Sequence, residues 1–118
     1  MKNLEQIRAR NALACRSKNI RGVNDGEVIK KIPPLIMNNG LLAAAAFAFN
    51  DKQGFKEVFT EIAIHLSDPE IQLLPNGVNT LDAMVDHLTS KGSSQDLRNC
   101  TNEAMAWLNY ARRFVTKS

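Results

Sequence analysis

The sequence predicts an all-α protein, a compact bundle of five to six helices around a buried, alanine-rich central helix. Three observations support this fold class. No stretch alternates apolar and polar residues as a half-buried strand does. Apolar residues instead recur at helical spacing along most of the chain. The segment Leu41–Phe49 is apolar on every side, which is typical of a helix surrounded by other helices.

The first half of the chain predicts three helices. A helix from Asn3 to about Asn19 is expected, followed by a loop over Asn19–Asn24 that is rich in asparagine. A second helix is expected from about Gly26 to Met37, and Pro33-Pro34 should break or kink it because proline cannot donate a helical hydrogen bond. Leu41–Phe49 then forms the central helix.

The second half predicts three amphipathic helices. In Lys52–Leu66, apolar residues recur at helical intervals from Phe55 to Leu66. A shorter helix is expected over Thr80–Ser90. The last helix, about Gln95–Val115, carries a continuous apolar face that includes Trp107, which we expect in the core.

Length and composition suit a single helical domain over residues 1–118, since 118 residues can bury a core of their own. No apolar run approaches the ~20 residues that a membrane span requires. The N-terminus resembles no signal peptide, so we expect a cytoplasmic protein. Cys15 and Cys100 are then expected to be free, packed thiols.

Positive charge is concentrated near the N-terminus. Residues 1–31 hold eight basic and three acidic side chains, a net charge of +5, whereas the rest of the chain has a net charge of −2. A basic region of this kind is a possible footprint for nucleic acid. The same charges would also suit a solvated helix surface.

The sequence shows no catalytic motif, no metal-binding spacing and no cofactor signature, so we expect none of these. His65 has Glu61 four residues before it, and His87 adjoins Asp86. A metal site would need more converging ligands than either pair supplies. We therefore expect both histidines and both acids on solvent-exposed helix faces.

Binding through basic side chains remains as the predicted chemistry, because lysine and arginine contact phosphate backbones by charge and hydrogen bonding. Few aromatic residues accompany these bases, so contacts to backbone and shape are expected, without base stacking. The candidate RNA-binding residues are Arg8, Arg10, Arg16, Lys18, Lys30, Lys31, Arg112 and Arg113.

Three motifs occur in a characteristic order. Residues 4–9 read L-E-Q-x-R-A, residues 31–41 read K-x-P-x-x-I-x-x-N-G-L, and residues 103–114 read E-A-x-x-W-L-x-x-x-R-R-F. Together they resemble the Cmr5 family, the small, all-helical subunits of type III-B (Cmr-type) CRISPR RNA-guided effector complexes. The region from Asn50 to Gly92 resembles that family only in its helical pattern.

This resemblance implies a non-catalytic subunit that stacks with copies of itself in an inner filament. The implied protein partners are the backbone and large subunits of the Cmr complex. Such a subunit helps line a basic groove for the duplex of crRNA and target RNA. Guide pairing then supplies the sequence specificity, as in other RNA-guided systems.

Two other classes of protein stay open from the residues alone. One is a free-standing helical adaptor or DNA-binding regulator, which would need an exposed recognition helix. The other is an enzyme without a known motif, which would need a pocket with converging polar groups.

Overall fold

The computed structural model describes residues 3–15, 27–50 and 54–114, and within these ranges the chain forms six α-helices and no strand. The prediction of an all-α bundle is confirmed. The loop expected over Asn19–Asn24 lies outside the described residues. No helix in the described ranges is both long and apolar enough to cross a membrane. The helices are α1 (Leu4–Ala14), α2 (Glu27–Asn39), α3 (Leu41–Ala48), α4 (Phe55–Leu66), α5 (Leu81–Ser90) and α6 (Ser94–Phe114).

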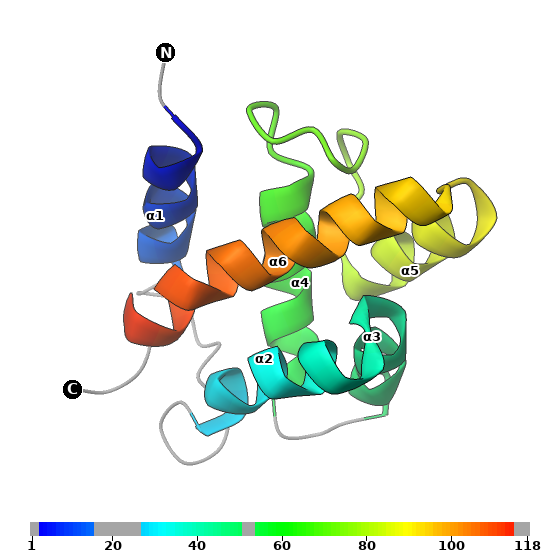
Figure 1. Ribbon diagram of the computed structural model, residues 1–118, viewed down its shortest axis with the longest axis horizontal. Coiled ribbons are helices and arrows are strands. Elements are labelled where there is room, and N and C mark those ends of the chain that lie inside the picture. The colour runs from blue at the N-terminus through cyan, green and yellow to red at the C-terminus, as the bar shows by residue number, and fades with distance from the viewer. Residues whose placement is uncertain (1–2, 16–26, 51–53, 115–118) are drawn as a thin grey trace.

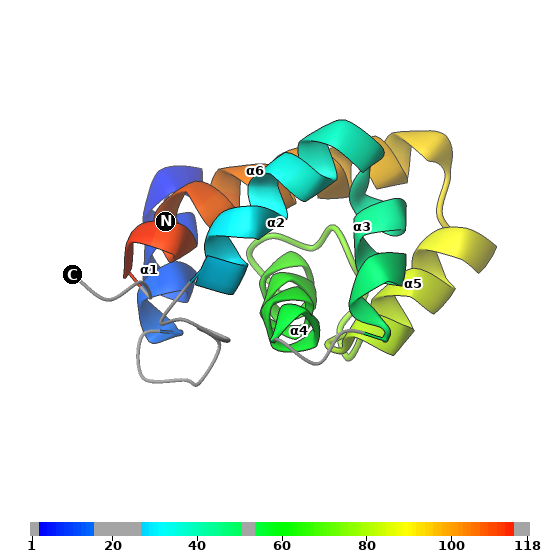
Figure 2. The same ribbon diagram turned by 90° about the horizontal axis from the view of Figure 1, so that it is seen from below.

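The long helix α6 runs across the whole molecule and contacts α1, α2, α3 and α4 (Figure 1). Helix α1 packs beside the C-terminal part of α6, while α5 lies near its N-terminal part. Seen from below, α2 lies along α6, and α4 fits between this pair and α3 (Figure 2). The middle of the bundle is therefore made by α4 and α6.

The apolar faces of α4 and α6 form the centre of the core. Val58, Phe59, Ile62 and Leu66 of α4 are all inaccessible to solvent, which confirms the amphipathic pattern predicted there. Trp107 is 1% exposed, as expected for a core residue. Buried apolar residues recur every three or four positions on both helices, so one apolar face of α4 packs against one apolar face of α6.

Helix α2 continues through Pro33 and Pro34, so the prediction of a break or a kink is wrong as to the break. The apolar face of α2 packs Ile29, Ile32 and Ile36 into the core. Pro33 and Pro34 leave the carbonyls of Ile29 and Lys30 without their helical donors. Lys30 is exposed, so water can satisfy its carbonyl, whereas Ile29 is 0% exposed. Packing of the apolar face of α2 against the core therefore outweighs the cost of the lost helical hydrogen bonds.

Helix α3 begins directly after Gly40, whose φ of 88° is readily adopted only by glycine. One face of α3 is fully buried, through Ala44, Ala45 and Ala48, but Phe47 is 55% exposed. The expectation of a helix buried on all sides at the centre is therefore wrong. Helix α3 packs against α2, α4, α5 and α6, but its remaining face, with Ala46 and Phe47, is exposed. Apolar composition alone does not determine whether a helix is buried on every side.

We predict that the two faces of α3 respond differently to enlargement. Ala45→Leu should lower the free energy of unfolding by about 1–3 kcal/mol, because no space exists for the added atoms. Ala46→Leu, on the exposed face of the same helix, should change it by less than about 0.5 kcal/mol. Urea denaturation of both variants measures the difference, and equal effects would contradict the described packing.

Candidate nucleic-acid interface

Four of the predicted RNA-binding residues lie on two neighbouring helices. Lys30 and Lys31 are exposed on α2, and Arg112 and Arg113 are exposed on α6. The two helices pack in opposite directions, so the start of α2 lies beside the end of α6 (Figures 1 and 2). Tertiary packing thus brings together bases from opposite ends of the sequence.

A groove of about 370 Å³ runs between the same two helices. Its α2 side is formed by Pro33 and Met37, and Lys30 precedes these by three and seven residues, on the same helix face. Its α6 side is formed by Met105, Ala106, Asn109 and Arg112. We call this feature the α2–α6 groove.

The side chain of Arg113 is held at the rim of the α2–α6 groove. Its Nη1 donates to the backbone carbonyl of Asn109 at 3.0 Å and to the Asn109 Oδ1 at 3.2 Å. Within the described ranges, Lys30 and Lys31 form no ion pair. The charges of Lys30 and Lys31 are therefore directed to solvent, whereas the guanidinium group of Arg113 is held against its own helix.

Arg8 has a different environment. Its Nε and Nη2 both donate to Glu103 on α6, each at 2.7 Å. The Glu103 side chain is only 7% exposed and that of Arg8 is 25% exposed. This two-pronged, largely buried ion pair is a strong interaction, and it fastens α1 to α6.

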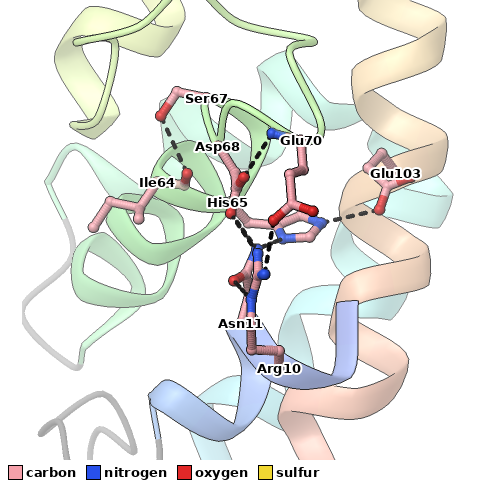
Figure 3. A network of polar contacts seen from close by, with 8 residues as sticks. All are labelled: Arg10, Asn11, Ile64, His65, Ser67, Asp68, Glu70 and Glu103. Atoms are coloured by element: carbon pink, nitrogen blue, oxygen red, sulfur yellow. Dashed lines mark hydrogen bonds and ion pairs between the residues drawn. The ribbon is translucent and has the colours of Figure 1, made fainter. Parts of the chain in front are cut away.

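His65 extends this contact to α4. Its Nε2 donates to Glu103 Oε2 at 2.9 Å, and its Nδ1 lies 2.9 Å from the amide nitrogen of Asn11. The Asn11 amide oxygen faces Arg10 Nε, a donor, so the amide nitrogen must face His65. His65 therefore carries its proton on Nε2 and accepts at Nδ1. Figure 3 shows His65 between Asn11 and Glu103.

Arg10 is also used inside the protein. Its Nη1 donates to Glu70 at 2.7 Å, and its Nη2 donates to Asp68 at 3.0 Å (Figure 3). Asp68 accepts a further hydrogen bond from Asn11. Arg10 and Asn11 thus tie α1 to the turn after α4. We call Arg8, Arg10, Asn11, His65, Asp68, Glu70 and Glu103 the α1 polar network.

The remaining two candidates, Arg16 and Lys18, lie outside the described residues. The eight predicted bases therefore divide into two on α1 that are engaged by carboxylates, four beside the α2–α6 groove, and two whose surroundings are not described.

The electrostatics of the α1 polar network follow from these contacts. Burial alone would raise the pKa of Glu103, but hydrogen bonds from Arg8 and His65 outweigh burial and lower that pKa from 4.5 to about 2. Burial alone would also raise the pKa of Asp68, but hydrogen bonds from the Glu70 amide and from Asn11 lower that pKa below the ordinary value. Both carboxylates are therefore ionised at neutral pH.

Two expectations about α4 are wrong. His65 is 2% exposed and Glu61 is 8% exposed, whereas both were expected on a solvated face. His65 follows Val58 and Ile62 at helical spacing, so it lies on the apolar face, and this signal was present in the sequence. Glu61 accepts a hydrogen bond from the Cys15 thiol at 3.3 Å. Nothing in the sequence marks that contact with the residue that follows α1.

Neither cysteine forms a disulfide and both side chains are buried, as predicted. Burial raises the pKa of the Cys100 thiol to about 11, helped by the charge of Asp96. A thiol in this environment stays protonated at neutral pH and is a poor nucleophile.

A cleft of about 510 Å³ lies between the turn after α4 and the helices α5 and α6. It is lined by Ser67, His87 and Asp96 among other residues. The Ser67 hydroxyl donates to the carbonyl of Ile64, so its proton is directed to the backbone. In the part of the chain that is described, no group of His, Cys, Asp and Glu residues is arranged to hold a metal ion.

A family model described as CRISPR-associated protein (Cas_Cmr5) matches residues 4–117. No curated protein and no solved structure matches the chain.

We predict that Glu103→Gln lowers the free energy of unfolding by about 2–3 kcal/mol at pH 7, because Arg8 and His65 lose a charged acceptor. The lowered pKa of Glu103 also makes the free energy of unfolding depend on pH. Its contribution is complete above about pH 4.5 and is lost as the pH falls through about 2. Denaturation between pH 2 and pH 7 should therefore show a steeper acid decline for the wild type than for Glu103→Gln.

Glu57→Gln is the matched control, since Glu57 is an exposed glutamate of α4. This variant should change the free energy of unfolding by less than about 0.5 kcal/mol. Parallel acid profiles for the wild type and Glu103→Gln would show that the Glu103 ion pair contributes no stability.

Proposed function

Because the chain belongs to the Cas_Cmr5 family of CRISPR-associated proteins, we propose that it is a non-catalytic small subunit of a type III-B CRISPR ribonucleoprotein complex. In this role it stacks with copies of itself and with the backbone and large subunits, and it helps line the groove for the duplex of crRNA and target RNA. The proposed setting is cytoplasmic antiviral defence, and the role requires no cofactor.

The observation that carries the RNA-binding part is the set of exposed bases beside the α2–α6 groove. Lys30 and Lys31 come from one helix, and Arg112 and Arg113 come from the other. Lysine acts on phosphate as a point charge, and arginine adds hydrogen bonds in a planar fork. A surface of this kind suits the phosphate backbone and leaves sequence recognition to guide pairing.

The proposal assigns Arg8 and Arg10 a structural role. Their guanidinium groups donate to Glu103, Asp68 and Glu70, so contact with phosphate would compete with bonds that hold α1 in place. The proposed RNA contacts are therefore centred on the α2–α6 surface. Arg16 and Lys18 remain candidates from the sequence.

We predict that the double variant Lys30→Glu/Lys31→Glu weakens target-RNA binding by the assembled complex about tenfold or more. Each lost phosphate contact should also reduce the slope of log K against log salt by about 1. Equilibrium binding of a matched target RNA at several salt concentrations measures both quantities. An unchanged affinity and slope would rule out RNA contact at this surface.

Lys91→Glu/Arg98→Glu provides the matched control, since both residues are exposed basic side chains at the other end of α6. The control makes the same change of net charge and should leave target-RNA binding within about twofold, because screened charges at a distance contribute little. Competition with duplex DNA tests the alternative of a DNA-binding regulator. Preferential binding of the isolated chain to a specific DNA sequence would favour that alternative.

A further inference from the structure

The floor of the α2–α6 groove is apolar, which contact with phosphates does not explain. Met37 is 74% exposed, the highest exposure among the large apolar residues of the described chain. Pro33, Met105 and Ala106 lie beside it in the groove. A phosphate backbone offers nothing apolar to cover these side chains, whereas protein interfaces are enriched in methionine.

The rim of the groove limits which protein segment could fit. Arg112 lines the groove and Arg113 is tethered at its edge, while Lys30 lies on the groove side of α2. Among the described residues that line the groove, none is acidic. A partner with carboxylates beside its apolar residues would therefore be complementary in charge, and a basic partner would be repelled.

The dimensions favour a short segment. A volume of about 370 Å³ accommodates one or two large apolar side chains, which matches the anchors that an amphipathic helix inserts into a groove. Methionine side chains are flexible and polarizable, so Met37 and Met105 can adapt to an aliphatic or aromatic anchor.

We propose that the α2–α6 groove is a docking site for an acidic, amphipathic helix of another protein subunit in the complex. Apolar anchors of that helix cover Met37, and its carboxylates face Lys30 and Arg112. This inference rests on the proposed role as a subunit, but it does not depend on contact with RNA.

Competitive assembly tests the docking site. Met37→Ser, mixed with wild-type chain during reconstitution of the complex, should be incorporated about tenfold less, which corresponds to about 1.4 kcal/mol. Met37→Leu keeps an apolar side chain and should be incorporated like the wild type. Leu13→Ser is the matched control, because Leu13 is 49% exposed on α1, away from the groove. Equal incorporation of Met37→Ser and the wild type would overturn the proposal.

A photo-crosslinking side chain, p-benzoylphenylalanine, in place of Met37 identifies the occupant in the purified complex. A crosslink to a sister-subunit helix with Asp or Glu beside its apolar residues is expected. A crosslink to RNA, to a second copy of this chain or to nothing would overturn the proposal. Met37→Ser should bind a duplex RNA probe as the wild type does. Lys30 takes part in both proposals, so RNA contact is tested separately by Lys31→Glu, which should weaken binding of the duplex RNA probe and leave incorporation into the complex unchanged.

Discussion

The buried carboxylate of Glu103 is the constraint on which the arrangement of three helices depends. The apolar face of α6 draws Glu103 into the bundle with Trp107 and Leu108, leaving it 6% exposed. An ionised carboxylate in that position is strongly destabilising unless charged or hydrogen-bonding groups surround it. Arg8 from α1 and His65 from α4 supply these groups. One side chain therefore sets where α1 and α4 meet α6.

This constraint explains why α1 docks by polar contacts. Only Ile7 and Ala12 of α1 are buried, which is a small apolar area for a helix of eleven residues. The α1 polar network replaces the missing apolar contact with directional bonds to α4, α6 and the turn after α4. The same network engages Arg8 and Arg10 with carboxylates, whereas Lys30, Lys31, Arg112 and Arg113 are exposed beside the α2–α6 groove.

Particular residues show how far sequence reasoning reaches. The buried faces of α4 and α6 were predictable from the sequence. Apolar residues at helical spacing, such as Val58, Ile62 and Leu66, fall on one face of a helix, and that face packs into the core. The prolines of α2 misled, since local propensity predicts a break, whereas packing of Ile29, Ile32 and Ile36 on the opposite face keeps the helix continuous. His65 misled because its polarity suggested a surface position, although its spacing placed it on the apolar face.

The sequence by itself determined the helical fold class, most helix boundaries to within a few residues, the burial of Trp107 and the membership of the Cas_Cmr5 family. These features depend on local periodicity or on motifs that are continuous in the chain. Only the tertiary structure decided that Arg8 pairs with Glu103, 95 positions away, and that Pro33 lines the same groove as Arg112. Such pairings depend on how helices cross, and the crossing is set by side chains from several helices at once, which no local pattern records.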